Sequence, residues 1–362
     1  MKNLKFSSEQ GLAFAQDLRQ GINQYFKSGE SRYANHSMVV KSILILTIYS
    51  LPLILLSTGL VAGIAPLFIL YIISGLGMAG IGMNIMHDAL HGSYAKNKFL
   101  NNLMGHSINL IGASASIWKI QHNVLHHTYT NVADADDDLN SSILLRFSPD
   151  KKLYWIHRFQ FIYAWFFYGL MTLIWVTARD FIRIRQYKKL GFFKKKSEFN
   201  SEVLKALAWK ITYFTYALAL PIIMVPQAWW IVVLAFLCMH YVTGSILSIV
   251  FQTAHVMPTS DFPKPDENGV IGNHWSVHQL HTTSNYAPKS TLFSWYIGGL
   301  NYQIEHHLMP NICHVHYKGL SKVVKALAKK HGLPYNSHKT FLQAVWDHLR
   351  MLKMLGQQQV HG

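Results

Sequence analysis

The stretch Gln121-His122-Asn123-Val124-Leu125-His126-His127 decides how the rest of this sequence is interpreted. It places three imidazoles within six residues, and neutral imidazole is a favoured nitrogen ligand for transition metals. On an α-helix, His122 and His126 would share one face. His127 would point about 100° away from His126, because an α-helix turns once in 3.6 residues. The stretch therefore predicts ligands for two neighbouring metal ions rather than one.

Two further histidine groups stand far from this stretch in the chain. His87 and His91 are spaced i,i+4 in HDALH, and His306 and His307 end the segment QIEHH that begins at Gln303. Seven such histidines exceed what one ordinary metal site needs. Each group begins or ends near a predicted membrane exit, so a chance placement of all three is a poor explanation.

The apolar residues gather in runs that are long enough to cross a bilayer, for which about 20 residues suffice. The predicted spans are about 39–58, 60–83, 208–225 and 228–250. They predict an all-α integral membrane protein with four transmembrane helices in two hairpins. Residues 156–177 are also long and aromatic, but basic residues flank both ends, so we expect an in-plane or re-entrant helix there.

The formal net charge of +16 is best explained by the positive-inside bias of membrane proteins, so no nucleic-acid partner is expected. The connections within the two hairpins carry no charge, which places the basic segments and all three histidine groups in the cytoplasm. We expect an N-terminal cytoplasmic helical segment at 1–38, with a helix near 12–26, and a membrane domain at 39–325. A basic helical tail follows at 326–362, and the histidine groups lie in a cytoplasmic helical cap. We expect no cleaved signal peptide, and the two cysteines suit a reducing compartment.

The three groups HDALH, HNVLHH and QIEHH resemble the histidine boxes of the membrane fatty-acid desaturases. Gln303 in place of the first histidine of box three resembles the front-end group, which desaturates between an existing double bond and the carboxyl end. The segments Thr128-Tyr129-Thr130-Asn131, Trp275-Ser276-Val277-His278-Gln279 and 295–301 strengthen the match. The resemblance covers roughly residues 35–325. It implies oxygen-dependent desaturation of an acyl-CoA or an acyl lipid at a diiron site.

The resemblance also implies which residues hold the two iron ions, with O₂ as co-substrate. An extra histidine after the fourth span serves as a ligand in this superfamily, and His255 is well placed for that role. Gln303 and His278 remain alternatives, either as ligands or as neighbours of the ligands. Asp88 and Glu305 could orient a ligating imidazole, whereas a solvated loop is expected for the acidic run at 134–138. The expected iron ligands are His87, His91, His122, His126, His127, His255, His306 and His307.

Acid–base side chains cannot remove hydrogen from an unactivated methylene, which is why a metal–dioxygen centre is expected. No haem-binding His-Pro-Gly-Gly segment is present, so we expect a separate electron donor, a ferredoxin or a cytochrome b5, and a bacterial plasma membrane. The nearest alternative is a related hydroxylase, ketolase or acetylenase. A metal transporter or sensor would carry ionisable residues along its spans, whereas these spans hold His240 and almost no acids.

Overall fold

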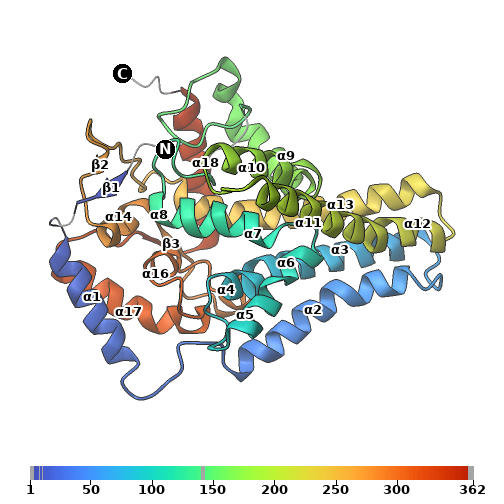
Figure 1. Cartoon of the computed structure of the whole chain (residues 1–362), viewed down its shortest axis with the longest axis horizontal. Coiled ribbons are helices and arrows are strands. Elements are labelled where there is room, and N and C mark those ends of the chain that lie inside the picture. Colours follow the sequence, from blue (N-terminus) through green and yellow to red (C-terminus); the bar gives the residue numbers. More distant parts are fainter. Residues whose placement is uncertain (1–3, 8, 10, 140–142, 358–362) are drawn as a thin grey trace. The chain divides into compact units, whose positions relative to one another are not determined.

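The computed structural model describes residues 4–7, 9, 11–139 and 143–357, and these are mostly helical (Figure 1). They form two compact units. Unit 1 comprises Met1–Asn35, Ile120–Ala164 and Ile249–Gly362, and unit 2 comprises His36–Lys119 and Trp165–Ser248. Residues 1–3, 8, 10 and 358–362, which belong to the expected terminal segments, lie outside the described residues.

Unit 2 is built on a hairpin of two apolar helices, α2 (His36–Leu56) and α3 (Ile64–Gly80), which lie side by side in Figure 1. The helices approach closely at Gly77, where an added Cβ would collide with the backbone of α2 at Tyr49. The Ser74 hydroxyl donates a hydrogen bond to the Tyr49 carbonyl across the same contact. Small residues allow this close packing of helices in lipid. The first predicted hairpin is therefore present.

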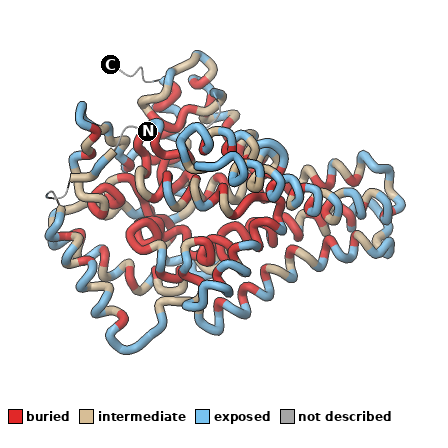
Figure 2. The backbone as a smooth tube through the Cα atoms, viewed as in Figure 1, coloured by how far each residue is buried: buried red, intermediate tan, exposed pale blue. Residues whose placement is uncertain are grey.

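Five helical runs are long and apolar enough to cross a membrane: His36–Leu56, Ile64–Leu90, Trp155–Lys189, Lys196–Met224 and Trp229–His255. Four of these contain most or all of the four predicted spans. The fifth, Trp155–Lys189, is 35 residues long and includes the segment that was expected to lie in the membrane plane. The predicted count of four spans is therefore not confirmed. Several apolar residues of α2, such as Val40 and Ile43, are exposed, which suits contact with lipid. Figure 2 shows that exposed and buried stretches alternate along this helix.

The remaining helices of unit 2 are short or interrupted by wider turns. A buried ion pair joins two of them, because Lys210 Nζ of α11 lies 2.8 Å from Asp180 Oδ2 at the start of α10. Helices α9 (Gln160–Ile174) and α13 (Trp229–His255) contain the division between the units. The others are α4 (Met86–Leu90), α5 (Lys98–Gly105), α6 (Ser107–Leu110), α7 (Ala115–Trp118), α10 (Asp180–Lys189), α11 (Lys196–Phe214) and α12 (Leu220–Met224), with π-helical turns at Ile81–Ile85, Trp175–Arg179 and Thr215–Ala219.

Unit 1 has its own apolar core between α1 (Leu12–Tyr25) and α17 (Tyr317–Lys330), which lie side by side in Figure 1. Phe14 and Leu18 of α1 pack with Leu320 and Val324 of α17. The helix expected near 12–26 is therefore confirmed. The other helices of this unit are α8 (His127–Tyr129), α14 (Trp275–Thr282), α15 (Thr291–Tyr296), α16 (Gln303–Leu308) and α18 (Phe341–Gln357), with 3₁₀ turns at Trp155–Phe159 and His314–His316.

Two very short parallel strand pairs tie distant segments of unit 1 together. Strand β1 (Lys5–Phe6) pairs with β2 (Val270–Ile271), and β3 (Asn285–Tyr286) pairs with β4 (Ser337–His338). A fully buried arginine, Arg146, adds a third tie, because its guanidinium donates to the carbonyls of Pro149, Lys151 and Leu355. These links tie segments of unit 1 that lie far apart in the sequence to one another.

Candidate metal centre

The second histidine box lies on a π-helical segment, Lys119–His126, which runs directly into α8. A π-helix bonds residues five apart, so His122 and His127 come together, with their Nε2 atoms 3.2 Å apart. The segment is thus π-helical and not the ordinary α-helix that we expected, because the histidine spacing does not reveal the wider turn. His122 and His126 nevertheless share one face as predicted, with stacked rings whose centroids lie 5.2 Å apart.

Three histidines from different parts of unit 1 converge at one point. His126 ends the π-helical segment, His255 ends α13, and His307 lies on α16, and each has one nitrogen within 4.8 Å of the others. All three side chains are fully buried. A second such group contains His127, His306 and His307. His126 and His127 thus fall into different groups, as two neighbouring metal ions would require.

In His122, His126 and His307 the Nδ1 atom is held by an oxygen atom of a neighbouring side chain. His126 Nδ1 lies 3.0 Å from both carboxylate oxygens of Asp136, and His122 Nδ1 lies 3.0 Å from Asp138 Oδ2. His307 Nδ1 lies 2.9 Å from Gln279 Oε1. A partner of this kind fixes the tautomer and the ring orientation of a metal-ligating histidine, so that Nε2 becomes the ligand atom.

The buried imidazole nitrogens at this convergence point suit the binding of a metal ion. Nε2 of His126 and Nε2 of His255 are buried and have no hydrogen-bond partner among the residues that the structure describes. Buried polar atoms are normally paired, and a divalent cation at the convergence point would supply the partner. Burial alone would lower the pKa of His126, but the charges of Asp136 and Asp138 raise it overall. A metal would therefore bind in place of that proton.

The acidic run after box two is not the solvated loop that we expected. The Asp136 side chain is fully buried, and only Asp134 is strongly exposed, where it pairs with Lys151 at 2.6 Å. The chain reverses at Asn131, which has a φ of 61° and donates its backbone N–H to Asp136 Oδ2 at 2.9 Å. This turn folds the run back onto box two, and the turn-prone Asn131 was the available signal.

Gln279 was not predicted as part of the site, although the segment Trp275–Gln279 supported the resemblance to the desaturases. Its Oε1 accepts from the Thr130 hydroxyl at 2.9 Å and contacts His307 Nδ1. Its amide and the Trp275 indole N–H both donate to the carbonyl of His127, at 3.2 and 3.0 Å. Helix α14 therefore holds both box two and box three through side-chain hydrogen bonds.

Gln303 and His278 differ in their surroundings. Gln303 is 2% exposed, and its Oε1 has no hydrogen-bond partner among the described residues. His278 lies against the Phe6 ring at 5.1 Å, and it is absent from the converging groups of ligand atoms that the described residues form. Burial lowers the pKa of His278 to about 4.

Glu305 does not orient a histidine through its carboxylate. It accepts instead from Asn285 Nδ2 at 2.8 Å and from the Tyr335 hydroxyl at 2.9 Å, and burial raises its pKa to about 7. Asn285 Oδ1 also accepts from the backbone N–H of Ile304. This network anchors α16 and therefore fixes the backbone that carries His306 and His307.

Box one belongs to unit 2. His87 and His91 lie with ring centroids 4.8 Å apart, and each ring lies 5.7 Å from the ring of Trp118. Asp88 is buried, but its Oδ1 is 4.0 Å from His87 Nδ1, which is longer than a hydrogen bond. The expectation that Asp88 orients an imidazole thus stays a prediction.

Residues 62–339 match the family of fatty acid desaturases. The chain belongs to this family. It is 30% identical over 366 residues to the sn-1 linoleoyl-lipid 6-desaturase of Synechocystis, covering 98% of both chains. It is 34% identical to the enzyme of the same name from Arthrospira platensis, over 78% of this chain and 76% of the relative. The acyl-lipid (8-3)-desaturase of Physcomitrium patens is 31% identical, over 98% of this chain and 74% of its own. This protein is therefore a membrane oxidoreductase that desaturates fatty acyl chains.

Proposed function

We propose that this desaturase acts on lipid-bound acyl chains and places the new double bond between an existing one and the carboxyl end. The relatives named above are acyl-lipid desaturases, and two of them are named as 6-desaturases of a linoleoyl lipid. Gln303 at the start of box three supports the same front-end assignment. An acyl-CoA substrate is the alternative that a direct assay separates.

We further propose that two iron ions are held by His87, His91, His122, His126, His127, His255, His306 and His307. The observation that carries this proposal is the buried convergence of His126, His255 and His307, whose ligand nitrogens lie within 4.8 Å of one another. Bound ferrous iron would supply the oxidising chemistry with O₂ that amino-acid side chains lack. Asp136, Asp138 and Gln279 hold the imidazoles in the ligating tautomer, and the burial of the cluster excludes water.

The stoichiometry of desaturation shows that the enzyme needs an external source of electrons and protons. Each turnover takes two hydrogens from the acyl chain and two electrons and two protons from elsewhere, and it reduces one O₂ to two waters. The electrons require a carrier protein, and we propose a separate ferredoxin or cytochrome b5. We propose that the site faces the cytoplasm, because the basic residues cluster in the segments that flank the spans. We propose a bacterial plasma membrane as the membrane that holds it.

Product analysis tests the proposed activity. The gene would be expressed in a host that makes linoleate but no front-end products, and lipid classes would be separated before mass spectrometry. We expect a product two mass units lighter, with the new double bond on the carboxyl side and enriched first in membrane lipids. A product that gains an oxygen would instead support the related hydroxylase. Early enrichment in the acyl-CoA pool would overturn the acyl-lipid assignment.

Metal content is a second, independent test. The anaerobically reconstituted protein should bind about two irons per chain, and His255→Ala should bind fewer. His348→Ala is the matched control, because His348 is also a fully buried histidine of unit 1 but donates to the Val256 carbonyl at 2.8 Å. Equal iron content in both variants would contradict the ligand assignment of His255.

A further inference from the structure

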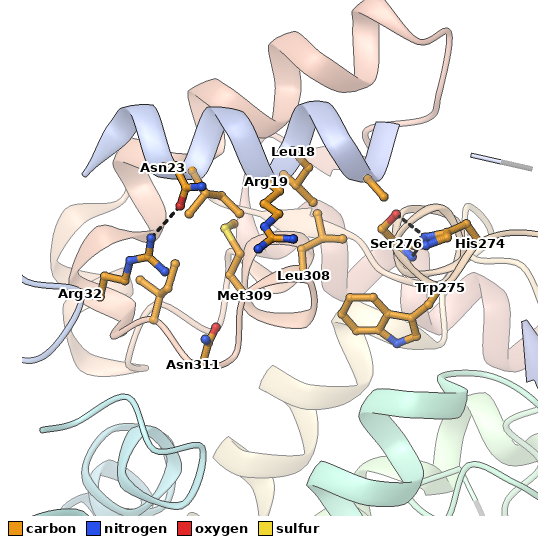
Figure 3. A pocket seen from close by; sticks show the side chains of 13 residues that line it. Leu18, Arg19, Asn23, Arg32, His274, Trp275, Ser276, Leu308, Met309 and Asn311 are labelled. Atoms are coloured by element: carbon orange, nitrogen blue, oxygen red, sulfur yellow. Dashed lines mark hydrogen bonds between the residues drawn. The ribbon is translucent and has the colours of Figure 1, made fainter. Parts of the chain in front are cut away.

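Unit 1 contains a half-open pocket of about 370 Å³ between α1, α14 and the segment that follows α16. Leu18 and Ile22 of α1 form one side, and Leu308 and Met309 form the floor. Figure 3 shows Arg19 pointing from α1 into this space and Arg32 entering it from the opposite end to Trp275. The lining of the pocket thus combines apolar side chains with two guanidinium groups.

The charged side chains that line this pocket are both arginines. Its lining includes Arg19, Arg32 and His274, and none of its lining residues is Asp or Glu. Arg32 is held in place by Asn23, whose Oδ1 accepts from it at 2.9 Å. Helix α17, which packs beside α1, adds four more exposed lysines, Lys318, Lys322, Lys325 and Lys329, whereas its Lys330 pairs with Asp17 of α1 at 2.7 Å. Such a surface attracts an acidic partner over long range.

The wall of the pocket is in direct contact with the candidate metal ligands. Trp275 lines the pocket, and its indole N–H donates to the carbonyl of His127 at 3.0 Å. Leu308 of the floor directly follows His307 on α16. A molecule seated in the pocket is therefore separated from the histidine cluster by one layer of side chains. Electron tunnelling falls steeply with distance, so this short separation suits electron delivery.

We propose that this pocket is the docking site for the electron donor, an acidic one-electron carrier protein that places a carboxylate between Arg19 and Arg32. This proposal rests on the proposed desaturase function and specifies where its partner binds. Two donor molecules are each oxidised by one electron per turnover, and the two electrons complete the reduction of O₂. Trp275 lies between the donor and His127, where its ring occupies the route into the cluster.

An anionic lipid headgroup would present similar chemistry to the two arginines. The pocket, however, is lined by α1, α14, α16 and nearby loop residues such as Arg32, and none of its lining residues belongs to the five candidate membrane spans. The observations therefore favour a protein partner, and the lipid becomes an outcome of the test.

The test measures binding without relying on turnover. The full-length protein in zwitterionic nanodiscs would be titrated with a fluorescently labelled plant-type ferredoxin, an acidic iron–sulfur protein, and in parallel with the soluble domain of cytochrome b5. We expect the double variant R19E/R32E to weaken the binding of the preferred donor at least tenfold, because both charges then repel it. Adding salt to about 0.5 M should weaken binding to the parent protein, since it shortens the range of the attraction.

Two further variants guard against misfolding and against a general charge effect. Asn23→Asp keeps the shape of its side chain but neutralises Arg32 in place, and we expect it to weaken donor binding several-fold. K339E/K353E makes the same change in net charge at two exposed lysines of unit 1 that do not line the pocket. It should leave the donor affinity within about twofold of the parent protein.

The outcomes separate this proposal from the proposed function. Donor binding that weakens in R19E/R32E and Asn23→Asp, but not in K339E/K353E, supports the docking site. Unchanged affinity in R19E/R32E overturns it, as does an effect that appears only when anionic lipids are present in the nanodisc. Because parent iron content and acyl products are measured separately, a failed docking result leaves the desaturase assignment standing.

Discussion

Replacing Asp136 with asparagine should weaken metal binding without disturbing the shape of the site. Oδ1 of Asp136 lies 3.0 Å from His126 Nδ1 and accepts from the backbone N–H of Asp138 at 2.9 Å. Oδ2 is also 3.0 Å from His126 Nδ1 and accepts from the backbone N–H of Asn131 at 2.9 Å. An asparagine offers one acceptor atom and one donor group in this space, so one backbone N–H must face another donor.

The cost follows from these contacts. One buried backbone N–H left without an acceptor costs about 1–3 kcal/mol, and the lost negative charge removes about 1 kcal/mol from the contact with His126. Asp136→Asn should therefore lower the free energy of unfolding of unit 1 by about 2–4 kcal/mol. Metal affinity should fall about 10–100-fold, as is typical when a carboxylate behind a ligating histidine is lost.

The assay is an anaerobic titration of ferrous iron against a chromogenic chelator, with thermal unfolding followed in the same samples. Asp134→Asn is the matched control, because Asp134 lies in the same loop but its side chain is 88% exposed. We expect the control to match the parent protein in both measurements. If Asp136→Asn bound iron within about twofold of the parent, a supporting role for Asp136 at the metal centre would be refuted.

Three further predictions concern packing, pH and metal removal. Gly77→Ala should destabilise the α2–α3 hairpin by about 1–3 kcal/mol through its clash with the backbone at Tyr49, whereas Gly82→Ala meets only flexible side-chain ends and should melt closer to the parent protein. Burial lowers the pKa of His348 to about 4 from an ordinary 6.5. Between pH 6.5 and pH 4, the His348 imidazole is therefore protonated in the unfolded chain but not in the folded protein. Stability should therefore fall by about 3 kcal/mol as pH drops from 6.5 towards 4, and denaturant unfolding of His348→Leu should show a shallower decline. Chelation of bound iron should lower the melting temperature, because a ligand of the native state stabilises it; an unchanged melting temperature would count against metal binding to the folded protein.

The histidine boxes could be predicted because the residues of each box stand close together in the sequence. His87 with His91 and His306 with His307 are recognisable as groups without knowledge of the fold. The first hairpin and the helix near 12–26 followed from apolar runs and amphipathic patterns, which are local properties. These features needed no contact between distant segments.

The features that the sequence did not reveal depend on such contacts. Asp136 looks like any loop acid until the turn at Asn131 brings it beneath His126. The two-residue strands β1 and β2 are too short to show a period of two, and their partners lie far apart in the chain. Whether Trp155–Lys189 crosses the bilayer depends on flanking charge as well as length, and these two considerations point in different directions.

Because Lys119–His126 is π-helical, the spacing of the histidines in box two does not by itself determine which of their side chains face one another. Grafting HNVLHH onto an ordinary α-helix of a designed protein would rotate His127 away from His122, although every letter of the motif would be preserved. Designers who borrow this motif must therefore copy its pitch together with its residues, and searches for similar centres should compare backbone winding as well as spacing.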